Sequence, residues 1–223
     1  VSLVGGVATF ASANVGSAIA VSQTGMSLSG SKASNYNLQS VAPSTGTINP
    51  RQLTVTANSL SKSYGDVDPV LTYAANGLIG GDALNGSLSR SPGNGIGSYP
   101  ITAGGLNAGG NYILSFVGAD FTINKKVLTV TADNKSRAFN TANPVLTVSY
   151  TGFANGETSA VLSSPATAST TAVISSPAGN YPIIASGAAA ESYSFNYVNG
   201  TLAVTSNTQT ISFAALADKL STD

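Results

Sequence analysis

Three aspartates have the residue type and spacing closest to metal-binding chemistry. Asp66 and Asp68 lie in the stretch Ser63–Pro69, and Asp82 follows further along. Carboxylate oxygens are ligands that Ca²⁺ prefers. Aspartate beside glycine and proline is also typical of a turn, and a later copy of this stretch, residues 135–144, contains no acidic residue. We therefore expect these aspartates to stabilise turns and expect no metal site, with Asp66, Asp68 and Asp82 as weak candidates.

The sequence lacks the usual side chains of nucleophilic catalysis. It contains no His and no Cys, so neither an imidazole base nor a thiolate nucleophile is present. A serine activated by a lysine is the remaining route, and no spacing selects such a pair. Lysine can also join asparagine in an intramolecular isopeptide bond, but nothing singles out any of Lys62, Lys125, Lys126 and Lys135. We expect no enzymatic activity, no catalytic residue and no cofactor.

Tyrosines are the other group that merits attention, because aromatic rings on a surface can stack on sugars. Most of them recur at equivalent positions in two copies of one segment, which is typical of core residues. We therefore favour core positions over a sugar-stacking surface. The tyrosines concerned are Tyr64, Tyr73, Tyr99, Tyr112, Tyr150, Tyr181, Tyr193 and Tyr197.

Composition excludes two classes of partner. Only 8% of the residues are charged, nine positive and nine negative, so the chain has no electrostatic footprint for nucleic acid. No apolar run approaches the roughly 18 residues that a membrane-spanning helix needs. Ser, Thr, Asn and Gly supply the polarity, as is typical of secreted β-rich proteins. We expect no nucleic acid partner and no membrane insertion.

Positioning of all these residues depends on an internal repeat. The stretch Leu53–Tyr73 recurs from Leu128, and the same offset relates Pro69 to Pro144. We call this constant spacing, which is 75 residues from Leu53 to Leu128, the repeat offset. Beyond these positions the second copy is longer by a short insertion within the Ser-, Thr- and Ala-rich run 163–177. Such self-similarity indicates a tandem array of small modules.

Alternation and turn residues predict β-strands within each copy. Leu53, Val55 and Ala57 alternate with threonines, which predicts a strand with one buried face. Gly65 and Pro69 predict a turn, and Asp82 predicts the N-cap of a short helical turn within 77–84.

Each copy closes on a predicted β-hairpin. Asn199-Gly200 is typical of a type I′ turn. The predicted pairs are Val198 with Thr201, Tyr197 with Leu202, Phe195 with Val204 and, around Gly118-Ala119 in the first copy, Phe116 with Phe121 and Leu114 with Ile123.

These patterns predict a mainly β protein of tandem small modules, β-grasp-like or Ig-like sandwiches, arranged end to end. The alternative is a parallel β-helix, whose coil period of about 20–25 residues is shorter than the observed repeat. The predicted segments are the rear part of a module (1–50), repeat A (51–126), repeat B (127–206), and the start of a further module or a tail (207–223). Junctions without linkers favour a semi-rigid array.

Several motifs resemble known bacterial modules. Gly6–Gly16, followed by Leu28-Ser29-Gly30 and Asn35–Leu38, resembles the rear half of the YDG module. Tyr64-Gly65-Asp66 in repeat A is similar to the name motif of the MBG module of YGX type, and repeat B departs from it with Ala138-Phe139-Asn140. Such modules occur in surface adhesins that resemble filamentous haemagglutinin.

The resemblance implies a function and a location. It implies a structural stalk or adhesin segment of a large secreted bacterial cell-surface protein, extracellular and exported across the outer membrane, that supports attachment or biofilm formation. Its expected partners are neighbouring modules of the parent protein and a host or environmental surface glycan or protein. The alternatives are a glycan- or ice-binding module, or a self-associating fibre subunit in which the incomplete first module accepts a strand from a neighbour. The sequence alone names no ligand.

Overall fold

The structure is a computed structural model that describes residues 1–215. Its internal contacts divide the chain into two compact units. Unit 1 comprises residues 1–61, 68–93 and 97–122, and unit 2 comprises residues 62–67, 94–96 and the chain from residue 123 onward. The short segment 62–67 of repeat A therefore belongs to the same compact unit as repeat B, so the units do not coincide with the sequence repeats.

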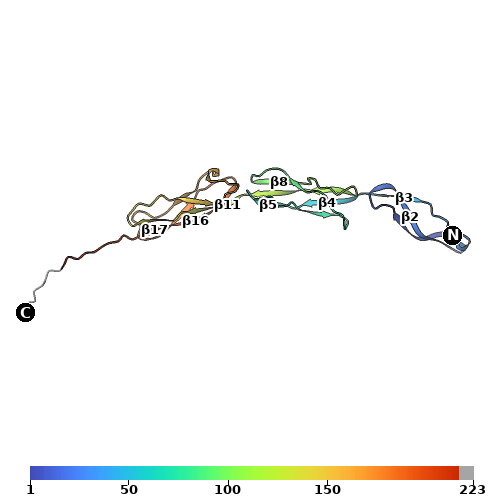
Figure 1. Cartoon of the computed structure of the whole chain (residues 1–223), viewed down its shortest axis with the longest axis horizontal. Helices are drawn as coiled ribbons and strands as arrows, with labels where there is room; N and C mark the ends of the chain where they lie inside the picture. The colour runs from blue at the N-terminus through green and yellow to red at the C-terminus, as the bar shows by residue number, and fades with distance from the viewer. Residues whose placement is uncertain (216–223) are drawn as a thin grey trace, which may run out of the picture. The chain divides into compact units, whose positions relative to one another are not determined.

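The regular secondary structure of the described residues is almost entirely β-strand (Figure 1). The prediction of a mainly β protein is confirmed. No helix among the described residues is long and apolar enough to cross a membrane. The elements are β1 (Ser2–Phe10), β2 (Gly16–Ser29), η1 (Ala33–Asn35), β3 (Ser44–Ile48), β4 (Arg51–Ala57), β5 (Leu60–Ser63), β6 (Tyr73–Asn76), β7 (Ser89–Arg90), β8 (Gly97–Thr102), β9 (Tyr112–Val117), β10 (Ala119–Asn124), β11 (Lys126–Ala132), β12 (Lys135–Ala138), β13 (Val148–Thr151), η2 (Ser159–Val161), β14 (Thr167–Ser169), β15 (Gly179–Ser186), β16 (Tyr193–Val198) and β17 (Gly200–Thr205).

The first sheet has three strands in the order β1-β2-β3, all antiparallel. No residue in 1–50 is buried, although β1 carries Leu3, Val7 and Phe10. A sheet stabilises itself mainly by packing one face against another layer. This sheet has no such layer among the described residues, so its apolar side chains remain accessible.

Each repeat folds into two sheets of the same pattern. In repeat A the sheets have the orders β6-β4-β9 and β5-β10-β8-β7, and in repeat B the orders β13-β11-β16 and β12-β17-β15-β14. Within the first sheet of each pair, the central strand is parallel to one neighbour and antiparallel to the other. This mixture of directions is that of a two-layer sandwich and differs from the uniformly parallel stacking of a β-helix.

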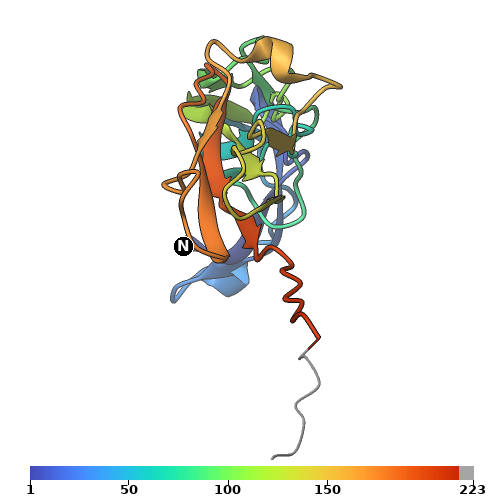
Figure 2. The ribbon, with the colours of Figure 1, turned by 90° about the vertical axis from the view of Figure 1, so that its left-hand side faces the viewer.

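The buried side chains come from both sheets of a repeat. The sequence Leu-Thr-Val-Thr-Ala places Leu53, Val55 and Ala57 in the core of repeat A, as predicted. In repeat B the side chains of β11 pack with those of β15 and β17, which lie side by side in orange and red (Figure 2). A hydrophobic face in contact with a second sheet is the main source of stability for such small modules.

The two predicted hairpins do not form. Leu114 and Phe116 of β9 lie opposite Leu53 and Val55 of β4, whereas β10 belongs to the other sheet. The predicted pairs Phe116–Phe121 and Leu114–Ile123 are therefore wrong. Consecutive strands joined by a single residue enter different sheets.

The same correction applies to repeat B. Phe195 and Tyr197 of β16 lie opposite Leu128 and Val130 of β11. In β17, Gly200 and Leu202 lie opposite Ile183 and Tyr181 of β15. The predicted pairs Val198–Thr201, Tyr197–Leu202 and Phe195–Val204 are wrong for this reason.

Gly200 has a packing role where a turn role was predicted. A type I′ turn needs positive φ at both central residues, and neither Asn199 nor Gly200 has one. A Cβ added at Gly200 would lie 2.3 Å from the carbonyl oxygen of Ala132. Glycine is required here because the backbone of β17 passes close to the end of β11.

Residues 206–215 contain no strand, and Ile211 and Phe213 are exposed. The described part of the segment predicted as the start of a further module or a tail is therefore without regular structure. The remainder of the predicted tail, residues 216–223, lies outside the described residues.

Candidate functional site

A tyrosine and a carboxylate form a pair in repeat A. Tyr112 opens β9, and its hydroxyl donates a hydrogen bond of 2.5 Å to Asp82 Oδ2. The same hydroxyl accepts a 3.1 Å hydrogen bond from the backbone N–H of Ile79. The Asp82 side chain therefore anchors the loop that follows β6 to the start of β9.

Repeat B contains the equivalent pair. Glu157 and Ala154 stand at the repeat offset from Asp82 and Ile79, and Tyr193 opens β16 as Tyr112 opens β9. The Tyr193 hydroxyl donates to Glu157 Oε2 and accepts a 2.9 Å hydrogen bond from the Ala154 N–H. Both repeats thus close the same loop with an acid and a tyrosine.

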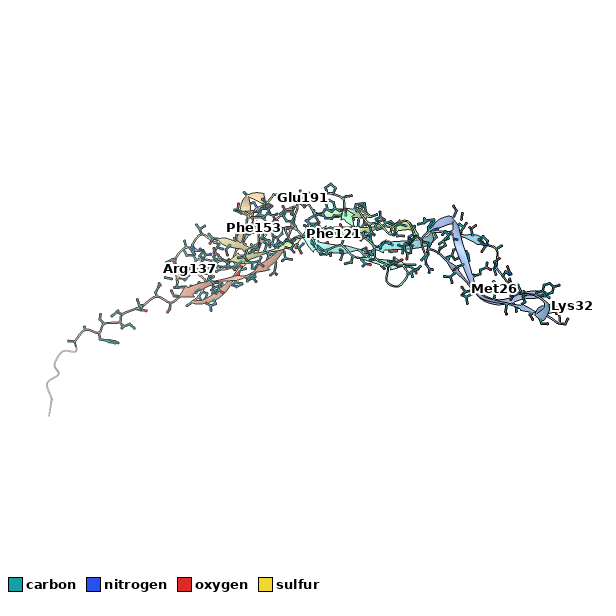
Figure 3. The ribbon with its side chains drawn as sticks, turned by 45° about the vertical axis from the view of Figure 1, so that its right-hand side comes forward. Met26, Lys32, Phe121, Arg137, Phe153 and Glu191 are labelled. Atoms are coloured by element: carbon teal, nitrogen blue, oxygen red, sulfur yellow. The ribbon has the colours of Figure 1, made fainter. Side chains whose placement is uncertain are left out.

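In unit 2 a second tyrosine joins the acid. We call residues 62–67 the Tyr64 turn. The Tyr64 hydroxyl donates a 2.7 Å hydrogen bond to Glu157 Oε1, and its ring meets Tyr193 edge to face, with ring centres 5.8 Å apart. Phe153, labelled in Figure 3, packs edge to face on Tyr193 at 5.6 Å. The half-buried Glu157 carboxylate therefore receives a phenol on each oxygen within an aromatic cluster.

Two further contacts hold the Tyr64 turn in unit 2. Gly65 has φ +81°, and a Cβ added there would lie 2.3 Å from the Ala154 Cβ. Asp66 accepts a 3.0 Å ion pair from Lys126. This ion pair is partly exposed, so it contributes little alone. The turn predicted at Gly65 is confirmed.

The carboxylates perturb the neighbouring phenols. The hydrogen bond to Glu157 is the main cause that raises the pKa of Tyr64, whereas burial is the main cause for Tyr193, with the Glu157 hydrogen bond second. In repeat A the hydrogen bond to Asp82 raises the pKa of Tyr112. A neutral phenol donates a hydrogen bond to a carboxylate, and ionisation would put two negative charges side by side. These tyrosines stay protonated and serve as hydrogen-bond donors.

The three candidate aspartates have separate roles. Asp66 pairs with Lys126, Asp68 pairs with Arg90 at 2.7 Å, and Asp82 binds Tyr112. Asp82 is not an N-cap, since residues 77–84 contain a turn and no helix. In repeat B a 3₁₀ turn, η2, does form, but its N-cap is Thr158. Within residues 1–215 no group of three or more acidic side chains is placed to hold a metal.

The tyrosines divide by exposure. Tyr193 is buried, and Tyr73 and Tyr197 are exposed. Tyr64, Tyr99, Tyr112, Tyr150 and Tyr181 are half-buried. Most tyrosine hydroxyls are used internally; Tyr150, for example, accepts from the Ala166 N–H at 2.7 Å. The recurrence of Tyr112 as Tyr193 thus reflects an internal contact that the two copies share.

Each repeat also contains an arginine clamp that the sequence did not reveal. In repeat A, Arg90 pairs with Asp68 and lies over the rings of Tyr99 and Phe121, 5.2 Å and 4.9 Å from their centres. In repeat B the buried Arg137 donates to Asn143, which stands at the repeat offset from Asp68, and to the Val173 carbonyl (Figure 3). A buried cation is tolerated when its donors are satisfied.

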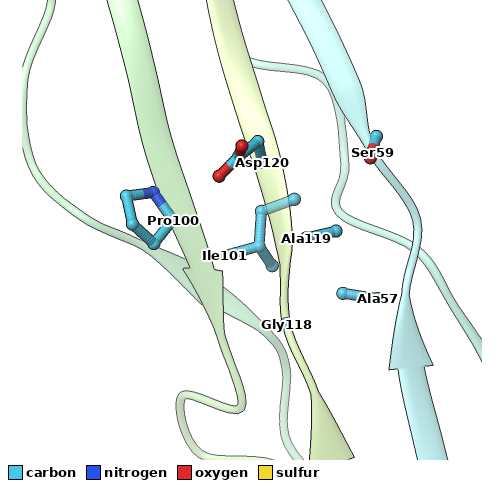
Figure 4. A pocket seen from close by; sticks show the side chains of 7 residues that line it. All are labelled: Ala57, Ser59, Pro100, Ile101, Gly118, Ala119 and Asp120. Carbon is cyan, nitrogen blue, oxygen red and sulfur yellow. The ribbon is translucent and has the colours of Figure 1, made fainter.

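A hollow of about 520 Å³ lies where the chain of repeat A crosses between its sheets (Figure 4). Its lining includes Ala57, Pro100, Ile101 and Gly118, and Asp120 is the ionisable residue among the lining side chains. A single carboxylate among small side chains has no partner for acid–base or metal chemistry. The acid–tyrosine pairs are therefore the better defined polar sites of the described chain.

Comparison with family models agrees with the sequence motifs. The model of the MBG domain (YGX type) matches residues 53–122 and 128–203, and that of the YDG domain matches residues 1–45. Because the first family covers more than half of the 223 residues, the chain belongs to the MBG domain (YGX type) family. The resemblance drawn from Tyr64-Gly65-Asp66 is thus confirmed, and repeat B is a member despite its altered turn. A search of curated proteins found no match.

Proposed function

We propose that this chain is a stalk or adhesin segment of a large secreted bacterial cell-surface protein, exported across the outer membrane, that supports attachment or biofilm formation. The segment spaces and orients a surface-binding region, and its partners are neighbouring modules and a host or environmental glycan or protein. The observation that carries the proposal is the Tyr64 turn: a turn of repeat A contributes a phenol, a glycine and a carboxylate to unit 2.

This observation supports a mechanical role because a segment of repeat A packs within the compact unit that contains repeat B. A chain of modules joined by flexible segments would bend at each junction. In unit 2, Tyr64 binds Glu157 and Asp66 binds Lys126. Both contacts hold the Tyr64 turn within unit 2.

The decisive experiment replaces residues 51–206 in the parent protein. A Gly/Ser segment of equal residue count should reduce attachment of displaying cells to abiotic and host surfaces, since it is flexible. A foreign rigid β-module array should restore attachment. Equal surface display is verified with a distal epitope tag. Full attachment with the flexible replacement would contradict the stalk role.

A self-associating fibre subunit is the second candidate. Among residues 1–215, no strand pairs with the outer edge of β1, and the sheet β1-β2-β3 buries no residue. Ile211 and Phe213 are exposed and alternate as in a strand. An open edge and an apolar extended segment are the parts required for strand addition between copies. Sedimentation over a concentration series tests this candidate: Ile211→Asp with Phe213→Asp should abolish any oligomer, and a strictly monomeric wild type would rule it out.

A further inference from the structure

The acid–tyrosine pairs of the two repeats differ in one respect. In unit 2, Glu157 receives two phenols, from Tyr193 and from Tyr64. In unit 1, Asp82 Oδ2 receives Tyr112, and no tyrosine from residues 1–50 occupies the place that corresponds to Tyr64. The loop between β1 and β2 instead contacts Asn111: the Asn111 side-chain amide donates to Asn14 Oδ1 at 3.0 Å, and the Val15 N–H donates to Asn111 Oδ1 at 2.9 Å.

A hollow of about 320 Å³ lies beside Asp82. Repeat A contributes Arg51, Ile79, Asn111 and Tyr112 to its lining, and the segment before repeat A contributes residues 13–15, Ile48 and Asn49. Ile79, which lines this hollow, shows that the hollow is open to solvent. Ala154, against which Gly65 packs in unit 2, is 6% exposed, whereas the equivalent Ile79 is 53% exposed. Ile79 and the hollow beside it therefore remain accessible in unit 1, next to the loop between β1 and β2 that contacts Asn111.

The lining retains the chemistry that binds the Tyr64 turn. Asp82 replaces Glu157 as the acceptor for a phenol, and Tyr112 replaces Tyr193 as the neighbouring ring. Arg51 stands at the position equivalent to Lys126 and supplies a cation at the place where Lys126 pairs with Asp66. The Arg51 Nε donates to the Gly77 carbonyl at 2.8 Å, and a guanidinium has further N–H donors that can bind a carboxylate.

We propose that this hollow binds the tyrosine side chain of a Tyr-Gly-Asp turn presented by another polypeptide. The phenol donates to Asp82, its ring packs against Tyr112, and the aspartate two residues later pairs with Arg51. Glycine after the tyrosine is required because the backbone must pass close to Ile79. The occupant is thus a peptide of the same kind as residues 61–68 of this chain, supplied from outside unit 1.

The test titrates the full chain with a synthetic peptide of residues 61–68, Ser-Lys-Ser-Tyr-Gly-Asp-Val-Asp, and follows backbone amides by NMR. Saturable shifts are expected at Ile79, Asp82 and Tyr112. A peptide with phenylalanine for tyrosine should bind about tenfold more weakly, since it lacks the charge-assisted hydrogen bond. A peptide with alanine for glycine should also bind more weakly, because the added Cβ would come too close to Ile79.

Matched variants of the chain locate the binding. Asp82→Asn keeps an acceptor for Tyr112 but removes the charge, and it should weaken binding about tenfold while distant amides keep their positions. Glu157→Gln, the equivalent change in unit 2, should leave the shifts at Ile79 unchanged.

Three results would overturn the proposal: no shift at Ile79 at millimolar peptide, equal affinity of the phenylalanine peptide, or equal affinity of Asp82→Asn. Saturable shifts at the same amides with a monosaccharide, in place of the peptide, would also overturn it and assign the hollow to a sugar.

Discussion

The hydroxyl of Tyr64 donates a hydrogen bond to Glu157, a residue 93 positions away in the sequence. Tyr64 lies in repeat A and Glu157 in repeat B, yet both belong to one compact unit. The contact makes the stability of repeat B depend on a residue outside its sequence boundary.

Removal of the Tyr64 hydroxyl should therefore weaken unit 2. Tyr64→Phe leaves the ring in place but deprives Glu157 Oε1 of its donor, so we expect a loss of about 1 kcal/mol in the free energy of unfolding. Hydrogen exchange of the buried amides Val130 and Leu202 measures it. Tyr73→Phe, which alters an exposed ring, is the control; an equal effect of both changes would show that the Glu157 contact is not stabilising.

Alkaline pH should destabilise unit 2 through its tyrosines. The folded-state pKa values of Tyr64 and Tyr193 are raised above the usual value of about 10. Their contribution is therefore fully present below pH of about 10 and is lost as the pH rises through the folded-state values. Melting temperatures between pH 8 and 12 should fall more steeply for the wild type than for Tyr64→Phe. Parallel curves for the two proteins would contradict this assignment.

Substitution of Gly200 tests the close approach of β17 to β11. Alanine would place its Cβ 2.3 Å from the Ala132 carbonyl oxygen, so the backbone must shift, and we expect a loss of about 1–3 kcal/mol. Gly80→Ala is the matched control, because a Cβ at Gly80 meets no atom within 4 Å. Chemical denaturation of both variants gives the comparison. If Asn199-Gly200 formed a type I′ hairpin, Asn199→Ala would be the equally harmful change.

Asn140 should be replaceable by glycine but not by alanine. It stands at the position equivalent to Gly65 and has φ +62°, so repeat B keeps the left-handed turn although its motif has changed. Asparagine tolerates this region better than other residues with a Cβ. We expect Asn140→Ala to cost about 1 kcal/mol and Asn140→Gly to be nearly neutral, as measured by thermal unfolding. A neutral alanine variant would show that the turn relaxes freely.

The repeat offset predicted the core because it relates residues by position alone. Leu53 and Val55 are buried, and so are Leu128 and Val130. Asn199-Gly200 misled because it is a local signal, and the pairing of β16 with β11 and of β17 with β15 satisfies many more backbone groups than one hairpin would. Strand pairing in the tertiary structure therefore outweighed the local turn preference of Asn199-Gly200.

The acid–tyrosine pairs were not predicted, although a signal existed. Gly81-Asp82 recurs as Gly156-Glu157 and Tyr112 recurs as Tyr193, so acid and tyrosine are retained together. Spacing could not show that they touch, because the connection between them differs in length in the two repeats. The partner of Glu157 that comes from the Tyr64 turn required coordinates, since only the fold brings that turn to repeat B.

The assignment of residues 62–67 to unit 2 has a consequence for excised domains and for gene duplication. A fragment cut between Lys126 and Val127 leaves repeat B without Tyr64, Asp66 and Lys126. The free energy of unfolding measured on that fragment will therefore underestimate the stability of repeat B within the intact array. Conversely, a duplication of repeat A also copies the Tyr64 turn, whereas a duplication of repeat B copies Phe139 and Asn140 in its place. An array can therefore lengthen by duplication and keep this contact, provided that the copies keep the residues equivalent to Tyr64 and Glu157.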